Sequence, residues 1–201
     1  MKVMNILKSM LLVSVFSLFS VSQAADTPEQ TIEKASTQLI NALKKEESTL
    51  KKDPKKLYSF IEKTAVPYFD FNTMSQWVMG RSWRDATPEQ RTKFMGEFKK
   101  LLINAYGSAL LEYTDDKVNV FPLPPNAKNK NEVTVKSEIT SSSHKPVAVN
   151  YSMIKSGGKW LVYDVSIEGV SIVTSYRGEI RELVNAKGID GMISALAQKN
   201  K

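Results

Sequence analysis

The sequence contains no cysteine and a single histidine among its 201 residues. Disulfide bonds, thiol nucleophiles and cysteine-bound zinc are therefore excluded, and histidine-based acid–base or metal chemistry is confined to one position. That position, His144, lies in the stretch Ser-Ser-Ser-His-Lys-Pro, which predicts a turn between two strands. We interpret His144 as a solvated loop residue, and we expect neither a metal site nor a cofactor.

Phosphate-binding glycine motifs are absent as well. Neither the Walker pattern nor the dinucleotide fingerprint occurs, so the sequence does not predict ATP hydrolysis. No serine lies in a nucleophile elbow. The carboxylates worth considering are Asp115 and Asp116 at a helix–strand junction, Asp164 on the solvent side of a strand, and Glu168. These positions favour structural roles, and we expect a protein that is not an enzyme.

Long apolar runs are lacking, except for a short one at the N-terminus. Lys2 and Lys8 precede an apolar run over residues 10–21 and the small residues that end at Ala24. This run is about a dozen residues, whereas a membrane-spanning helix needs about 20. The pattern predicts a secretory signal peptide over residues 1–24, cleaved after Ala24, and one exported, soluble domain over residues 25–201.

The chain is basic, with a formal net charge of +7, and removal of Lys2 and Lys8 lowers this charge to +5. Export argues against nucleic acid as a partner. A positive surface suits anionic lipid headgroups or acidic patches on proteins, although it equally serves solubility.

Helical patterns occupy both ends of the expected domain. Thr87 predicts the clearest helix start, because Pro88 and Gln90 follow it as in a capping box. Asp53 predicts a second cap, and Gly80 predicts a helix end. Apolar spacing of 3–4 residues predicts helices over residues 27–51, 54–66, 71–79, 88–113, 173–184 and 190–199.

The segment between these helical regions is rich in β-branched and aromatic residues. Val133, Val135 and Ile139 alternate with polar residues, and the next segment alternates in the same way. The pattern predicts four strands in an antiparallel meander, over residues 117–121, 132–139, 147–154 and 159–167. One apolar sheet face must be covered by helices, so we predict an α+β fold.

Apolar and aromatic residues are dense between Tyr68 and Trp83. A cavity lined by such residues would suit acyl chains, whereas the same spacing is also that of an ordinary packed core.

Two long stretches resemble the MlaC or toluene-tolerance family. The first runs from Asp70 to Arg91 and continues with Phe94 and Phe98. The second runs from Trp160 to Ser171 and continues with Tyr176-Arg177. The resemblance spans essentially the whole expected domain, and it implies a twisted antiparallel sheet, related to the NTF2-like fold, wrapped by helices that enclose a hydrophobic cavity.

The resemblance also implies a function. Members of this family are periplasmic phospholipid-binding proteins that shuttle a two-chain phospholipid between an outer-membrane lipoprotein complex and an inner-membrane ABC transporter with a substrate-binding ring. This traffic maintains the lipid asymmetry of the outer membrane. The resemblance therefore implies a periplasmic lipid carrier.

The family's lining is diffuse, so the candidate lining residues follow from periodicity. We expect the acyl chains to contact Phe71, Met74, Val78, Leu101, Tyr106, Leu110, Val133, Val135, Val147, Val149, Tyr151, Val165 and Ile167. Arg81, Arg84 and Lys99 are candidates for docking to acidic partner surfaces, or are simply solvated. Two alternatives stay open: an NTF2-like enzyme acting on a small hydrophobic substrate, and a periplasmic chaperone.

Overall fold

The computed structural model describes residues 25–127, 129–141 and 145–201. The predicted signal peptide, residues 1–24, and His144 lie outside the described residues. Within the described part, the chain forms helices, then an antiparallel sheet, then a final helix, which confirms the α+β prediction.

The N-terminal half is helical, and its helices begin at the predicted caps. The Thr87 hydroxyl accepts a hydrogen bond from Gln90 N at 3.2 Å, and Thr87 N donates to Gln90 Oε1 at 3.0 Å. Asp53 Oδ1 accepts from Lys55 N at 3.0 Å. These caps satisfy N–H groups that have no partner within a helix. The helices are α1 (Pro28–Leu50), α2 (Pro54–Thr64), α3 (Phe71–Met79), α4 (Ser82–Asp85) and α5 (Pro88–Tyr106).

The end of α5 differs from the prediction. The helix ends at Tyr106 instead of continuing to residue 113, and a 3-10 turn, η2 (Ala109–Glu112), follows. Gly107 lies directly after the end of the α-helix, before the 3-10 turn begins. A Cβ there would be 2.5 Å from Ile103 O and 2.8 Å from Ile61 Cδ1, so only glycine allows α2 to approach this closely. The α-helix prediction was wrong here because periodicity cannot detect this contact.

The sheet is a meander of neighbouring strands in the order β1 to β5. The four predicted strands are confirmed within two residues, and a fifth, two-residue strand pairs with the end of β4. That strand is too short to give a periodic signal. The strands are β1 (Lys117–Val120), β2 (Glu132–Thr140), β3 (Val147–Ser156), β4 (Lys159–Ile167) and β5 (Val170–Ser171).

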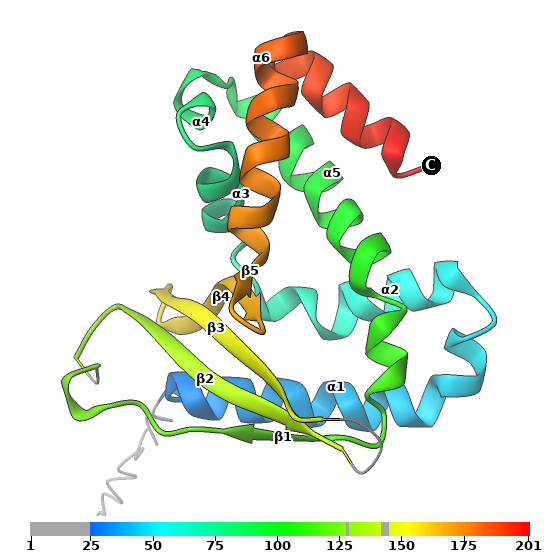
Figure 1. Cartoon of the computed structure of the whole chain (residues 1–201), viewed down its shortest axis with the longest axis vertical. Helices are drawn as coiled ribbons and strands as arrows, with labels where there is room; N and C mark the ends of the chain where they lie inside the picture. Colours follow the sequence, from blue (N-terminus) through cyan, green and yellow to red (C-terminus); the bar gives the residue numbers. More distant parts are fainter. Residues whose placement is uncertain (1–24, 128, 142–144) are drawn as a thin grey trace, which may run out of the picture.

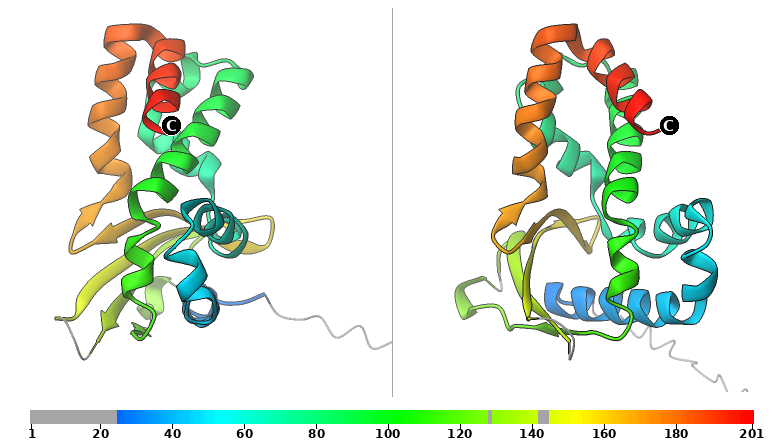
Figure 2. Two further views of the ribbon diagram at one scale, coloured as in Figure 1. Left: turned by 90° about the vertical axis from the view of Figure 1, so that its right-hand side faces the viewer. Right: turned by 45° about the vertical axis from the view of Figure 1, so that its right-hand side comes forward.

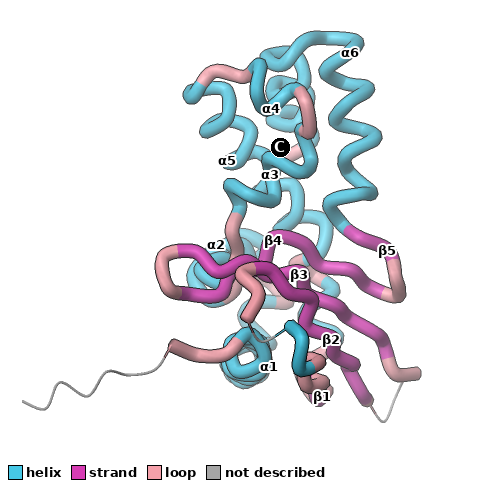
Figure 3. The backbone as a smooth tube through the Cα atoms, turned by 90° about the vertical axis from the view of Figure 1, so that its left-hand side faces the viewer, coloured by secondary structure: helices cyan, strands magenta, loops and turns pink. Residues whose placement is uncertain are grey.

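The molecule has two ends joined by α5. Figure 1 shows the curved sheet with α1 at one end, and α3, α4 and α6 (Ile172–Lys199) at the other. Figure 3 shows that α6 continues directly from β5 at the sheet edge. At Gly188 the backbone leaves helical geometry (φ 68°, ψ 178°), and the last turns fold back beside α5 (Figure 2).

Buried apolar side chains form three separate clusters. The helical cluster joins α3, α5 and both parts of α6, and it includes Met74, Phe98 and Leu196. The sheet cluster packs Ile32 of α1 against one face of β2, β3 and β4. The basal cluster joins α1, α2 and the end of α5. Phe69, just before α3, packs against both the helical and the sheet clusters, so it links the two ends.

Candidate functional site

The inner face of the sheet carries the largest group of predicted lipid contacts. Val135 pairs with Tyr151, and Tyr151 pairs with Val165, so these side chains form one row across three strands. Val149 lies opposite Ser137, on the same face. The structure places six predicted residues in or against the sheet cluster: Val133, Val135, Val147, Val149, Tyr151 and Val165.

A bulge in β4 keeps this face apolar along the whole strand. Ser152 pairs with Asp164, whereas the next residue of β3, Met153, pairs with Val162, so Tyr163 is an extra residue. Because one residue is inserted, Val162 and Val165 are both buried in the sheet cluster despite their odd spacing. Tyr163 can then lie against α3, where its ring stacks on that of Trp77.

One end of the apolar face is not covered. Ile167 is 38% exposed and Val170, its partner on β5, is 63% exposed. Ile139 and Val147 pair at the same end and are only partly buried. Contiguous apolar surface of this kind is typical of a binding site. We call these four residues the open apolar end.

The predicted helical contacts are distributed over different places. Phe71, Met74, Val78 and Leu101 belong to or pack against the helical cluster, whereas Leu110 packs against the basal cluster. Tyr106 is 38% exposed. Burial raises the pKa of Tyr176 on α6 to about 12, and the charge and hydrogen bond of Tyr106 add to this rise. Tyr106 therefore connects α5 to α6 at the surface and is not enclosed.

Polar groups on the inner face are few and uncharged. Ser137 Oγ donates to Val149 O at 2.8 Å within the sheet. Burial raises the pKa of Tyr151, which a hydrogen bond to Ser137 lowers only in part, so this tyrosine stays neutral. Among the charged side chains of the described chain, Asp116 alone is buried, and it lies just before β1.

The remaining carboxylates considered from sequence have structural partners. Asp164 accepts hydrogen bonds from Ser171 Oγ at 2.6 Å and from Val173 N at 3.0 Å, so it holds the start of α6. Asp115 pairs with Lys44 at 2.7 Å, and the hydrogen bond from Lys44 holds the pKa of Asp115 below its usual value. Glu168 accepts from Ala148 N. Each of these three carboxylates therefore has a structural role in holding neighbouring elements together.

The described residues offer neither a metal cluster nor a membrane span. No group of three or more histidine or acidic side chains is arranged to hold a metal ion in residues 25–127, 129–141 and 145–201. Over the same residues, no helix combines the length and apolar character needed to cross a bilayer.

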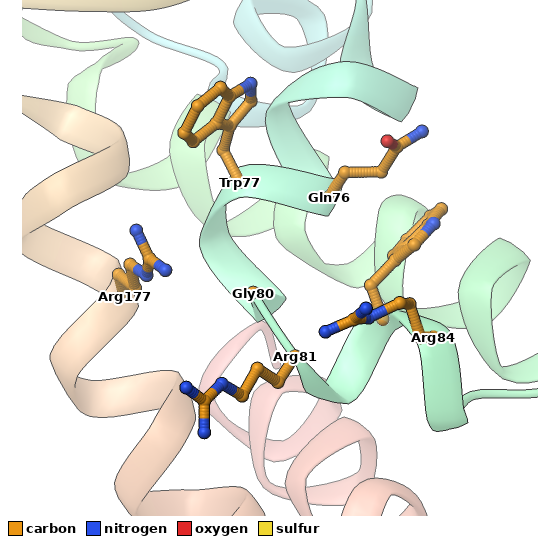
Figure 4. A pocket seen from close by; sticks show the side chains of 7 residues that line it. Gln76, Trp77, Gly80, Arg81, Arg84 and Arg177 are labelled. Atoms are coloured by element: carbon orange, nitrogen blue, oxygen red, sulfur yellow. The ribbon is translucent and has the colours of Figure 1, made fainter.

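The predicted docking residues fall into two places. Arg81 and Arg84 line a hollow of about 440 Å³ between α3, α4 and α6, which we call the arginine pocket (Figure 4). Arg177 of α6 completes it, together with Gly80 and the indoles of Trp77 and Trp83. Lys99 lies elsewhere, where it pairs with Glu62 at 2.5 Å. Sequence reasoning missed Arg177, which lies almost a hundred residues from Arg81.

A second hollow of about 620 Å³ lies between the loop after β1 and the strands β2 and β4. It includes Val133 and Tyr163. The Tyr163 hydroxyl donates to Glu132, and burial together with Glu132 raises the pKa of Tyr163 to about 12. Because Tyr163 stacks on Trp77, the two hollows lie on either side of one aromatic pair.

Known proteins resemble this chain over most of its length. The family model described as MlaC protein matches residues 33–198. The toluene tolerance protein ttg2D of Pseudomonas putida is 29% identical over 182 residues, 90% of this chain and 83% of that protein. The intermembrane phospholipid transport system binding protein MlaC of Haemophilus influenzae is 25% identical over 194 residues, 94% of this chain and 90% of that protein.

A solved structure has the same fold. It is the phospholipid-binding protein from Ralstonia solanacearum in complex with a phospholipid. The two structures agree with a TM-score of 0.81 and 28% sequence identity, and the match covers 87% of this chain and 97% of the other.

Proposed function

Because the chain belongs to the MlaC family, we propose that it is a periplasmic phospholipid carrier that holds the acyl chains of its lipid against the inner face of the sheet. Its lipid would pass between an outer-membrane lipoprotein complex and an inner-membrane ABC transporter, and this traffic would maintain lipid asymmetry. The Ralstonia relative holds a phospholipid and the Haemophilus relative is named for phospholipid transport, which supports the proposal.

The observation that carries the proposal is the open apolar end. In a protein with a fully packed core, Ile167 and Val170 would be covered by a helix, yet both are exposed at the edge of an apolar face. Acyl chains that enter at this end would pass Val149, the partner of Ile167, and reach the row formed by Val135, Tyr151 and Val165. The shortage of charged groups on this face fits a hydrocarbon ligand and leaves an acid–base enzyme without its catalytic groups.

The free energy of hydrocarbon transfer explains why a carrier is needed. Two acyl chains contain roughly 30 methylene groups, and exposing each to water costs about 0.8 kcal/mol, so the total is on the order of 20 kcal/mol. A phospholipid therefore does not cross an aqueous space unaided. The apolar face replaces the membrane interior at similar free energy, so the direction of transfer is set by the donor and the acceptor.

The experiment is a charge placed at the open apolar end. Ile167→Glu puts a carboxylate where the chains would enter, and since the side chain is already part-exposed, the variant should fold. Ser156→Glu, at the exposed end of β3 and outside both hollows, is the matched control. Native mass spectrometry of protein purified from cells should find phospholipid on the wild type and on Ser156→Glu, and little on Ile167→Glu.

The same experiment separates the alternatives. Wild-type protein that carries no lipid would favour an enzyme or a chaperone over a carrier. A folded Ile167→Glu protein that keeps its lipid would show that the chains lie elsewhere.

A further inference from the structure

The arginine pocket lies on the side of α3 that faces away from the interior. Met74, Val78 and Met79 are buried on one side of α3, whereas Gln76 and Trp77 are exposed on the other. The pocket is lined from this exposed side (Figure 4). It is therefore separate from the inner face of the sheet, where we place the carried lipid.

Three guanidinium groups surround this pocket without a matching negative charge. No aspartate or glutamate lines it, and no ion pair in the described part of the chain involves Arg81, Arg84 or Arg177. Exposed lysines such as Lys93 and Lys100, in contrast, have carboxylate partners on their own helix. Guanidinium groups bind phosphate through paired hydrogen bonds, so the pocket is suited to a phosphorylated anion.

The chain is built so that Arg177 can approach α3. Gly80 ends α3 with a φ of 56°, a conformation that side chains other than glycine rarely adopt. A Cβ at this position would lie 3.3 Å from one terminal nitrogen of Arg177. Glycine therefore both turns the chain toward Arg81 and leaves room for the guanidinium of α6.

Two indoles border the pocket and are held in place. Trp77 is 49% exposed, and its ring stacks on Tyr163 with 6.3 Å between centroids and 18° between planes. The Arg91 guanidinium lies 5.2 Å from the Trp83 ring centroid, and Arg91 Nε donates to Trp83 O at 2.9 Å. Tryptophan is enriched where a protein meets the boundary between headgroups and acyl chains, because its ring is apolar and its N–H is polar.

We propose that the arginine pocket binds the phosphate of an anionic phospholipid in a bilayer surface, at a site distinct from that of the carried lipid. Its volume of about 440 Å³ lies in the range of small-ligand sites and suits a headgroup. A protein partner would instead need about 800 Å² of complementary surface on each side. The arginines supply attraction to the headgroups, and the exposed indole of Trp77 enters the interface. This site would dock the carrier on a membrane.

The test compares two variants that each lose two positive charges. Arg81→Gln/Arg177→Gln empties the pocket of two guanidinium groups, and Lys45→Gln/Lys52→Gln removes two exposed lysines outside it. The probes are vesicles of phosphatidylcholine alone and of phosphatidylcholine with phosphatidylglycerol, measured by co-sedimentation. Each arginine near an anionic surface contributes about a fivefold gain in affinity, so the arginine variant should bind the anionic vesicles about 25-fold more weakly than wild type.

Three controls distinguish a built phosphate site from general attraction between a basic protein and an anionic surface. The lysine variant should stay within about twofold of wild type. Wild-type tryptophan fluorescence should shift to the blue on anionic vesicles, and Trp77→Phe should lose most of this shift. Native mass spectrometry should find the carried lipid unchanged in the arginine variant, so that failure here is distinguishable from failure of the carrier function.

Four results would overturn the proposal. Equal losses in the two double variants would show unspecific attraction, and loss of the carried lipid in the arginine variant would make the pocket part of the cargo site. Binding of glycerol 3-phosphate without vesicle binding would identify a soluble ligand. Binding of a polyglutamate peptide without vesicle binding would point to an acidic protein.

Discussion

Gly96, within α5, and Gly107, directly after it, offer a matched test of how closely the basal cluster is packed. Gly107 has Ile103 O and Ile61 Cδ1 at 2.5 and 2.8 Å from the position of an added Cβ, whereas Gly96 has nothing within 4 Å. The same substitution by alanine should therefore have opposite effects at the two positions.

The magnitudes follow from these distances. Overpacking of a closely packed site costs about 1–3 kcal/mol, and the better helix propensity of alanine offsets about 0.5–1 kcal/mol of this. We expect Gly107→Ala to lower the free energy of unfolding by about 1–2 kcal/mol, which for a chain of this size lowers Tm by about 2–8 °C. Gly96→Ala should raise Tm by about 1–4 °C, because alanine has the better helix propensity and its Cβ would meet no neighbouring atom at this position.

Thermal unfolding followed by circular dichroism measures both effects. A double-mutant cycle then identifies the contact. Ile61→Val removes the methyl group that an alanine at position 107 would meet, so it should destabilise the Gly107→Ala protein less than it destabilises wild type. If Gly107→Ala were as stable as Gly96→Ala, the close approach of α2 to the end of α5 would be refuted.

Two further predictions concern the start of α5 and the contact between α5 and the end of α6. Thr87→Ala removes the capping box of α5 and should cost about 1 kcal/mol, seen as a Tm about 2–4 °C lower, whereas Thr87→Ser should keep most of the stability; equal Tm values would contradict the capping role. Burial alone would raise the pKa of Glu97, but hydrogen bonds from Lys100 and Asn200 hold it below its ordinary value of 4.5. A carboxyl group whose pKa is lower in the folded protein than in the unfolded chain stabilises the fold at pH values above the unfolded pKa. This stabilisation is lost as the pH falls through the folded pKa. The Tm difference between wild type and Glu97→Gln should therefore shrink on acidification below pH 4.5, and a constant difference would contradict this coupling.

Most of the fold could be predicted because its signals are local. Thr87 and Asp53 cap their helices through residues two or three positions away, and strand alternation reports a sheet face directly. The short elements α4 and β5 escaped because a few residues show no period. The end of α5 escaped because it depends on Ile61, a neighbour in space and not in sequence.

The candidate site could be predicted only in part, for a related reason. Periodicity identifies the apolar face of an element but not what covers it. Val149 and Leu110 both follow an apolar pattern in the sequence. In the structure, however, Val149 lies in the sheet cluster, whereas Leu110 packs against the basal cluster. Arg177 lies near Arg81 because α6 packs beside α3. Local sequence patterns do not predict which helices pack together, so the pairing of these two arginines could not be predicted.

The fold-back at Gly188 has a consequence for the order in which the protein folds. The sheet is built from strands that follow one another along the chain, so it can form early. The helical cluster instead needs Met192 and Leu196 to pack against Met74 and Phe98, which lie about a hundred residues earlier in the chain. Because contacts between segments far apart in the sequence form more slowly than contacts between neighbouring strands, we expect the helical half of the molecule to be completed after the sheet.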